Sequence, residues 1–345
     1  MKIAIATVQV PFINGGAELH TSNLADALRQ AGHEVDIVTM PFWFNPSPLL
    51  ERYESAWAAE DMSVYLSGSI DQVICLKYPT YQLQHPNKKL WLLHPLSSMY
   101  DFYGTPYGGD PKDPQTRAFR SGLLARDRAA FGQIEKRFTV SDYLAGEMKR
   151  IVDVDFEPLY HPPPNPEVYR LEGSYPFIFA PSRLEEQKRQ DILIRAMKLV
   201  DPRLHLVVAG SGGQVAQCKR IARESGVLDR VVFAGDLNRS RIASYYANCF
   251  AVYFGPFAEP YGYITLEAML SSKPVITCLD SGCPTEFVRH GINGSIVEPT
   301  PESVADEINR MWGDRKNARD MGRVGRILYD ELGLDWAHVA NKLVI

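Results

Sequence analysis

Cysteine, net charge and long apolar runs are all in short supply in this chain. Its five cysteines form no C-x-x-C pair and most lie in apolar stretches, which indicates buried, reduced thiols and argues against a disulfide framework. A formal net charge of -4 over 345 residues gives no general attraction for nucleic acid. No apolar run is long enough to span a membrane, and the first residues lack the pattern of a signal peptide. We therefore expect a cytoplasmic protein that binds no nucleic acid, and we leave open a peripheral contact with the inner membrane face.

Motifs for several nucleophiles and cofactors are also missing. The sequence has no G-x-S-x-G element and no cluster of His, Cys and carboxylates at metal-ligand spacing. It has no G-x-G-x-x-G, and no acidic residue follows the run "HEVDIVT" as a dinucleotide ribose would require. The chain is therefore expected to hold no metal and no dinucleotide cofactor.

The sequence does contain an alternation of short apolar runs and amphipathic segments, and this alternation occurs in two successive parts of the chain. The runs "KIAIATV" and "HEVDIVTM" flank a helical pattern that ends at Gly32, which predicts a β-α-β unit with parallel strands. The proline-rich stretch "EPLYHPPPNPEVYRLEGSYP" interrupts the alternation, which then starts again. We predict an α/β protein with two Rossmann-like doubly wound parallel-sheet domains, 1–160 and 161–330, facing a cleft. Residues 331–345 are expected to form a helix that packs back on the first domain.

Two glycine-rich turns follow predicted strands. Gly15 and Gly16 in "INGGAE" open the first helix, and Gly210 to Gly213 in "AGSGG" precede a helix of the second domain. Backbone N–H groups at such a helix start can approach an anion, because the helix end is positive and its first amides are unpaired. Ordinary tight turns have the same pattern. The residues leave both interpretations open for the first turn and favour the ordinary turn for the second.

Charged residues stand just after predicted strands. "SRLEEQK" places Arg183 and Lys188 after the strand "FIFAP" and at the entry to a helix. Two cations at that place can hold a diphosphate and stabilise the charge that it gains on leaving, although either residue alone would be read as solvated surface. His94 ends the apolar run "LWLLHP" in the first domain, where it would face the cleft. We interpret His161, inside the proline-rich stretch, as structural.

The stretch "FGPFAEPYGYITLEAM" contains two glutamates eight positions apart. Its prolines keep the helix from starting before Gly262, so Glu259 lies in a loop and Glu267 lies inside the helix. The first amides of that helix, near Tyr263 to Thr265, are expected to face the cleft. A carboxylate beside a positive helix end suits neutral hydroxyls, such as those of a sugar.

Taken together, these segments resemble the retaining, nucleotide-sugar-dependent glycosyltransferases of family 4, which have the GT-B fold. Glu259 and Glu267 have the E-x7-E spacing of that family, and "EPYGYITLEAM" is close to its usual E-P-F-G-x-x-x-x-E-A-M. The resemblance covers nearly the whole chain, including "GGAE", "LLHP", "VSDYLAGEMKR", "SRLEEQKRQDILIRAM", "VVAGSGG" and "SGCPTEFVRHGINGSIVEP". Two positions depart from the pattern, since Ser182 and Arg189 stand where the family commonly has glycine. We expect Arg189 to face solvent or the phosphates.

The resemblance implies a role for each candidate residue. Glu267 would bind the ribose hydroxyls of the donor, and Glu259 would contact hydroxyls of the transferred sugar. Arg183 and Lys188 would hold the diphosphate, and His94 would lie next to the transferred sugar. The other donor contacts that it implies are Gly16, Leu237 at the base, and the helix start at Gly262, Tyr263, Ile264 and Thr265.

The implied reaction is transfer of a hexosyl group from a nucleoside diphosphate sugar to an acceptor hydroxyl, with retention of anomeric configuration and without a cofactor. The acceptor could be a glycan, a lipid-linked molecule or a small molecule, and the setting could be cell-envelope or exopolysaccharide synthesis. The segment 97–116 is rich in Gly, Pro, Tyr and Asp, which predicts a long surface loop. It matches no family pattern and is where we expect acceptor choice to be made. Three alternatives stay open: a nucleotide-sugar epimerase, a phosphorylase, and a nucleotide-sugar-binding protein without turnover.

Overall fold

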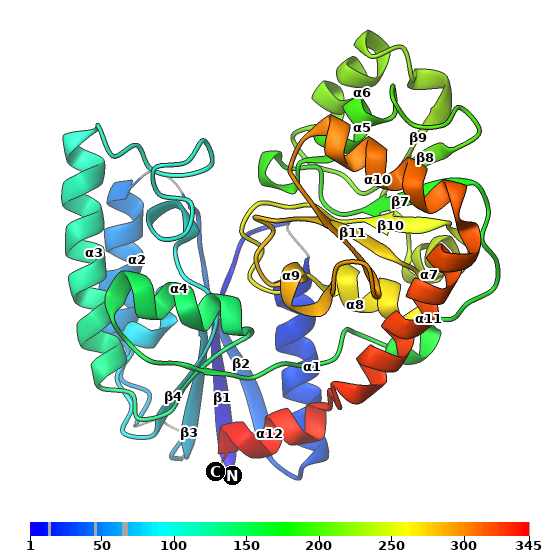
Figure 1. The fold of residues 1–345 in the computed structure, drawn as a ribbon. Coiled ribbons are helices and arrows are strands. Elements are labelled where there is room, and N and C mark those ends of the chain that lie inside the picture. Colours follow the sequence, from blue (N-terminus) through cyan, green and yellow to red (C-terminus); the bar gives the residue numbers. More distant parts are fainter. Residues whose placement is uncertain (13–14, 45–46, 64–67, 345) are drawn as a thin grey trace. The chain divides into compact units, whose positions relative to one another are not determined.

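Two compact units make up the chain. Unit 1 comprises Met1–Pro164 together with Leu334–Ile345, and unit 2 comprises Asn165–Gly333. Each contains one six-stranded sheet whose paired strands all run parallel, which confirms the predicted α/β class (Figure 1). The computed structural model describes residues 1–12, 15–44, 47–63 and 68–344.

The sheet of unit 1 has the strand order β2-β1-β3-β4-β5-β6. Its strands are β1 (Lys2–Gln9), β2 (Glu34–Pro41), β3 (Gln72–Lys77), β4 (Lys88–His94), β5 (Arg137–Thr139) and β6 (Glu157–Pro158). Its helices are α1 (Gly16–Gln30), α2 (Ser47–Ala59), α3 (Pro114–Gly132), α4 (Asp142–Val152) and α12 (Trp336–Val344). β3 is buried along its whole length, as expected for a central parallel strand whose two faces are both covered.

The segment 97–116, predicted to be a long surface loop, is only partly one. It begins with a 3-10 turn at Ser97–Met99, and α3 takes over at Pro114. Between them Tyr100 is 3% exposed, and its hydroxyl donates to the Asp127 carboxylate of α3 at 2.6 Å. The base of this loop is therefore anchored in unit 1, and its tip carries the exposed residues.

Helix α12 packs beside α1 in unit 1 (Figure 1). Aromatic rings form part of this contact. The Trp336 ring centroid of α12 lies 5.6 Å from that of His20 on α1 and 5.2 Å from that of His161. His20 Nδ1 and His161 Nε2 are 3.2 Å apart, and both side chains are buried. Burial lowers the pKa of both rings, to about 3 for His161, so both are neutral near pH 7. His161 therefore has a structural place, in agreement with the sequence interpretation.

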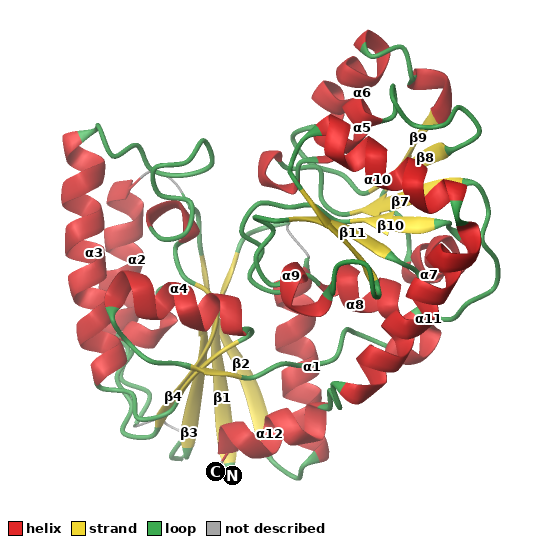
Figure 2. Cartoon of the chain, viewed as in Figure 1, coloured by secondary structure: helices red, strands yellow, loops and turns green. Residues whose placement is uncertain are grey.

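The sheet of unit 2 has the strand order β12-β11-β10-β7-β8-β9. Figure 2 labels the strands β7 to β11 of this sheet. Its strands are β7 (Phe177–Pro181), β8 (His205–Ala209), β9 (Val231–Gly235), β10 (Ala251–Tyr253), β11 (Val275–Cys278) and β12 (Gly294–Val297). Its helices are α5 (Gln190–Ala196), α6 (Val215–Glu224), α7 (Arg239–Asn248), α8 (Tyr263–Leu270), α9 (Pro284–Phe287), α10 (Pro301–Gly313) and α11 (Arg315–Glu331). Nowhere in the described parts of the chain is a helix both long and apolar enough to cross a membrane.

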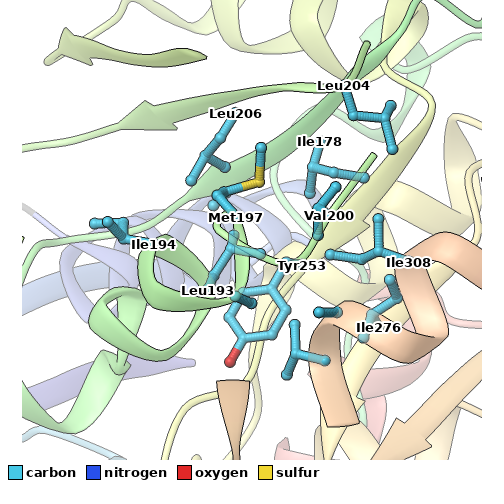
Figure 3. Close-up of a cluster of buried hydrophobic side chains, with 14 of the residues drawn as sticks. Ile178, Leu193, Ile194, Met197, Val200, Leu204, Leu206, Tyr253, Ile276 and Ile308 are labelled. Carbon is cyan, nitrogen blue, oxygen red and sulfur yellow. The ribbon is translucent and has the colours of Figure 1, made fainter. Parts of the chain in front are cut away.

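A close-packed apolar core holds the strands of unit 2 in place. Figure 3 shows Ile178 of β7 and Leu206 of β8 beside Leu193 and Met197, with Ile308 of α10 at the other side. These side chains are at most 1% exposed, and burying one of them stabilises the fold by about 1.5 to 3 kcal/mol. Figure 1 shows α5, α6 and α10 on this face of the sheet and α7 and α8 on the other. The strand ends from which the functional loops leave are therefore firmly supported.

Candidate functional site

The centre of the unit 2 sheet is where its strand order changes direction. The chain builds outward from β7 through β8 to β9, and then returns to add β10 on the opposite side of β7. In open α/β sheets, ligands bind outside the carboxyl ends of the strands at such a switch point. The loop after β7 carries Arg183 and Lys188, and the loop after β10 carries Glu259. The switch point of unit 2 therefore brings together residues that the sequence singled out from two distant motifs.

Lys188 and Glu259 are in direct contact across this point. The Lys188 ammonium donates a hydrogen bond to Glu259 Oε2, and the two side chains are 14% and 19% exposed. Each group therefore compensates the charge of the other while remaining accessible to a ligand. Arg183 lies in the same loop as Lys188 and is exposed, and within the described residues its guanidinium has no ion-pair partner. An anionic ligand could therefore bind the Arg183 guanidinium without first displacing a carboxylate.

The glycines of "AGSGG" support the Arg183 loop by close backbone approach. A Cβ on Gly210 would lie 2.1 Å from the Ser182 carbonyl oxygen, and one on Gly212 would lie 2.3 Å from that of Leu184. Two backbone hydrogen bonds join the segments, from the N–H of Ser182 to Ala209 O at 3.0 Å and from the N–H of Leu184 to Ser211 O at 2.8 Å. This turn therefore holds the cationic loop in position, and the described contacts give the glycines a packing role.

Arg189 does not face solvent or a phosphate position, so the expectation for this residue was wrong. Its guanidinium is 7% exposed and pairs with both carboxylate oxygens of Asp280, at 2.8 and 2.6 Å. It also donates to the carbonyl oxygens of Gly255 and Pro256, at 2.9 and 2.7 Å. Arg189 therefore ties the loop after β7 to the loops after β10 and β11. Its φ of +52° is left-handed, which explains why glycine suits this position in the similar family.

Glu267 lies on α8 and is surrounded by hydroxyl donors. The Tyr246 hydroxyl of α7 donates to Glu267 Oε2 at 2.7 Å, and the Tyr169 hydroxyl lies near the same carboxylate. Burial raises the pKa of Glu267, while the two tyrosine hydroxyls favour its ionised form and oppose that rise. Neither tyrosine was predicted, since nothing in a single sequence marks a buried tyrosine as the partner of a given glutamate.

The start of α8 depends on Gly262. This residue has φ +84°, and a Cβ there would lie 2.7 Å from Phe254 Cε1, so both the backbone and the packing require glycine. Tyr263 and Ile264 are partly exposed, whereas Thr265 is fully buried and its N–H already donates to Gly262 O at 3.1 Å. A ligand that used the Thr265 amide would have to compete with that bond.

The remaining candidates lie at the carboxyl edges of the two sheets. Leu237 follows β9 in unit 2 and is half-buried. In unit 1, Gly16 begins α1 directly after Gly15, whose N–H donates to Glu18 Oε2 at 2.8 Å; Ile13 and Asn14 of the "INGGAE" motif lie outside the described residues. His94 ends β4, with its Nδ1 2.9 Å from the Pro95 carbonyl oxygen. Gly16 and His94 thus belong to unit 1, and the other candidates to unit 2.

No group of three or more His, Cys, Asp or Glu side chains among the described residues is arranged to hold a metal ion.

Comparison with known proteins identifies what this arrangement is similar to. Residues 163–327 match the family model described as glycosyl transferases group 1. An uncharacterized glycosyltransferase of Methanocaldococcus jannaschii is 28% identical, with 100% of this chain and 97% of the relative covered. A GDP-mannose-dependent alpha-(1-6)-phosphatidylinositol monomannoside mannosyltransferase of Mycobacterium tuberculosis is 31% identical over 46% of this chain and 43% of that protein.

Among solved structures, sucrose-phosphate synthase from Thermosynechococcus elongatus superimposes with a TM-score of 0.79 at 20% identity, covering 99% of this chain and 97% of the other. At this identity the likeness shows the fold. It confirms the GT-B prediction.

Proposed function

We propose that this chain, whose residues 163–327 match the family model of the glycosyl transferases group 1, transfers a hexosyl group from a nucleoside diphosphate sugar to an acceptor hydroxyl with retention of anomeric configuration. The observation that carries this proposal is the pairing of Lys188 with Glu259 at the switch point of unit 2, with exposed Arg183 in the same loop as Lys188. The M. tuberculosis relative is named as dependent on GDP-mannose, which supports a nucleotide sugar as donor.

The charges at the switch point suit the two ends of such a donor. Arg183 and Lys188 bind the diphosphate, because cations form strong, charge-assisted hydrogen bonds with phosphate oxygens. Glu259 accepts hydrogen bonds from hydroxyls of the transferred sugar, and Glu267 accepts them from the ribose. Glu259 and Glu267 therefore bind hydroxyls in this scheme and do not form an acid and base pair.

In the proposed reaction, the bond between the anomeric carbon and the diphosphate oxygen breaks while a bond to the acceptor oxygen forms. The acceptor proton passes to the departing diphosphate on the same face of the sugar. Negative charge grows on the leaving group, so Arg183, Lys188 and the amides at the start of α8 interact more strongly with the transition state than with the bound donor. These groups lead us to propose that no metal ion is needed.

We assign unit 1 to the acceptor, with Gly16 and His94 at the carboxyl edge of its sheet and the anchored segment 97–116 nearby in sequence. Synthesis of a cell-envelope glycan or exopolysaccharide is a setting that suits the mannosyltransferase relative. Contact with the inner membrane face remains part of this proposal.

Release of nucleoside diphosphate tests the proposal. Purified protein is incubated with UDP-, GDP- and ADP-sugars, with and without sugar or lipid-linked acceptors, and in the presence of EDTA. One donor class should turn over, and Arg183→Ala should lower kcat about 10²- to 10³-fold, as removal of one preorganised donor to a developing anion does elsewhere. Arg195→Ala, an exposed arginine at the far end of α5, is the matched control and should leave kcat unchanged. Tight donor binding without turnover under any acceptor would instead identify a nucleotide-sugar-binding protein.

A further inference from the structure

A buried tyrosine hydroxyl points at the carboxylate of Glu267. The side chain of Tyr246 is fully buried, and its hydroxyl donates to Glu267 Oε2 at 2.7 Å. The Tyr246 ring is fixed by two edge-to-face contacts, with Phe179 of β7 at 5.1 Å and with Tyr169 at 5.6 Å between centroids. The hydroxyl therefore has one position, set by packing on the sheet, and it holds one carboxylate oxygen.

A second hydroxyl reaches the same carboxylate from a different part of unit 2. Tyr169 follows the 3-10 turn Pro166–Val168 at the beginning of the unit, and its side chain is buried at 5% exposure. Its hydroxyl lies near enough to Glu267 to favour the ionised carboxylate, so α7 and the first segment of unit 2 both stabilise the glutamate of α8. A carboxylate has about four lone-pair sites, and two donors leave the rest for a ligand.

We propose that Tyr246 and Tyr169 are positioning residues, which fix the Glu267 carboxylate in the orientation that accepts the ribose hydroxyls of the donor. This inference rests on the proposed function, because it takes Glu267 as the ribose-binding group. The tyrosines act through Glu267 and do not touch the donor. Without them the carboxylate could turn among its rotamers, and a ligand would have to restore the order that the free protein already provides.

The other titratable and charged groups around Glu267 are few. Arg239 at the start of α7 favours the ionised carboxylate, and Tyr263, one turn earlier on α8, is a partly exposed neighbour of Glu267. Removal of the Tyr246 hydroxyl takes away a bond to the charged form, so the pKa of Glu267 should rise further above its ordinary value. A positioning role thus predicts a change in the pH profile of ribose recognition as well as in affinity.

The test compares ribonucleoside diphosphates with their 2′,3′-dideoxy counterparts by calorimetric titration, with UDP, GDP and ADP as the probes. Wild-type protein should prefer the ribose form of one of them. In Tyr246→Phe the affinity for that ribonucleotide should fall about tenfold, the loss expected when a hydrogen bond to a charged group is removed, while the dideoxy affinity stays the same. As the pH is lowered, the remaining preference of Tyr246→Phe for the ribonucleotide should also disappear at a higher pH than in the wild type.

Tyr245→Phe is the matched control, since it makes the same change at the next position of α7, where the ring stacks on Phe179 at 5.2 Å. It should behave as the wild type does. Tyr169→Phe provides a second variant, with the same expected loss, should Tyr246→Phe fail to fold.

The possible failures are distinguishable. Equal ribose preference in wild type, Tyr246→Phe and Tyr169→Phe would overturn the positioning role and leave the proposed function intact. A parallel loss of ribose and dideoxy binding would overturn it too, because it would show a general structural effect. A wild-type protein that binds a nucleoside diphosphate with no ribose preference would overturn the role of Glu267, and the inference with it.

Discussion

The ammonium of Lys188 is hydrogen-bonded to the carboxylate of Glu259, seventy-one positions later in the chain. The proposed diphosphate cation and the proposed sugar-binding carboxylate are thus paired with each other. A nucleotide sugar has to share this pair, with its diphosphate on the lysine side and its sugar on the glutamate side. Substitutions of the two residues should therefore have opposite effects on a ligand that lacks the sugar.

Glu259→Gln should leave the affinity for a free nucleoside diphosphate unchanged or stronger, because Lys188 loses a competing partner, while turnover of the nucleotide sugar falls. Lys188→Met should weaken binding of the free nucleoside diphosphate by about 1.5 to 3 kcal/mol, the usual value of a hydrogen bond to a charged group. Calorimetry with the diphosphate and steady-state kinetics with the sugar donor separate the two. Equal weakening of the free diphosphate by both variants would contradict the division of roles.

Arg189→Met should destabilise unit 2 by about 3 kcal/mol, because it leaves the Asp280 carboxylate and two buried carbonyl oxygens without their donor. Urea denaturation followed by circular dichroism measures this loss. Arg323→Met removes an exposed pair with Asp320 three residues earlier on α11, which should cost at most about 1 kcal/mol. A similar, small loss of unfolding free energy in both variants would show that Arg189 does not hold the three loops of unit 2 together.

Gly262→Ala should impair both folding and donor binding, since the new Cβ would meet Phe254 Cε1 at 2.7 Å at the start of α8. Gly226→Ala is the matched control: it has a similar φ of +71°, with nothing within 4 Å of the new Cβ. The control should lose only the backbone term of about 1 to 2 kcal/mol in unfolding free energy and keep full donor affinity. If Gly262→Ala lost no more unfolding free energy and donor affinity than Gly226→Ala, close packing at the start of α8 would be unimportant.

Unit 1 should lose stability in acid because of its buried histidines. The folded pKa of His161, about 3, lies below the ordinary value of about 6.5, so the unfolded chain binds more protons below pH 6.5. Stability is therefore complete above that pH and falls as the pH drops towards 3, by about 2 kcal/mol between pH 6.5 and 5 for one such group. The fluorescence of Trp91 and Trp336, whose rings flank the histidines, can follow the transition.

The His161→Gln variant isolates this contribution. Burial raises the pKa of Asp127 to about 7, which acts in the opposite direction, because a raised folded pKa adds stability that is lost as the pH rises through it. Asp127 contributes equally to the unfolding free energy of the wild type and of the variant, so its contribution cancels when one is subtracted from the other. The variant should show the flatter decline below pH 6.5, and identical slopes would contradict the neutral, buried state of His161.

The sequence predicted the two parallel α/β units from the alternation of strands and helices, and it singled out Lys188 and Glu259 without predicting that the two side chains pair directly. It did not predict the roles of Arg189 and Tyr246. Which polar groups pair between two loops or two helices depends on how those elements pack in space, and no local sequence pattern contains that information. Helix α2 (Ser47–Ala59) also went unpredicted, since it directly follows a proline- and aromatic-rich run without a clear apolar period.

The anomeric configuration of the product tests the central claim most directly. Proton NMR of the product formed from the donor that turns over should show, at the transferred sugar, the same anomeric configuration as in the donor. A product of inverted configuration would contradict the proposed mechanism, because a proton transfer to the departing diphosphate on the same face of the sugar could not produce it.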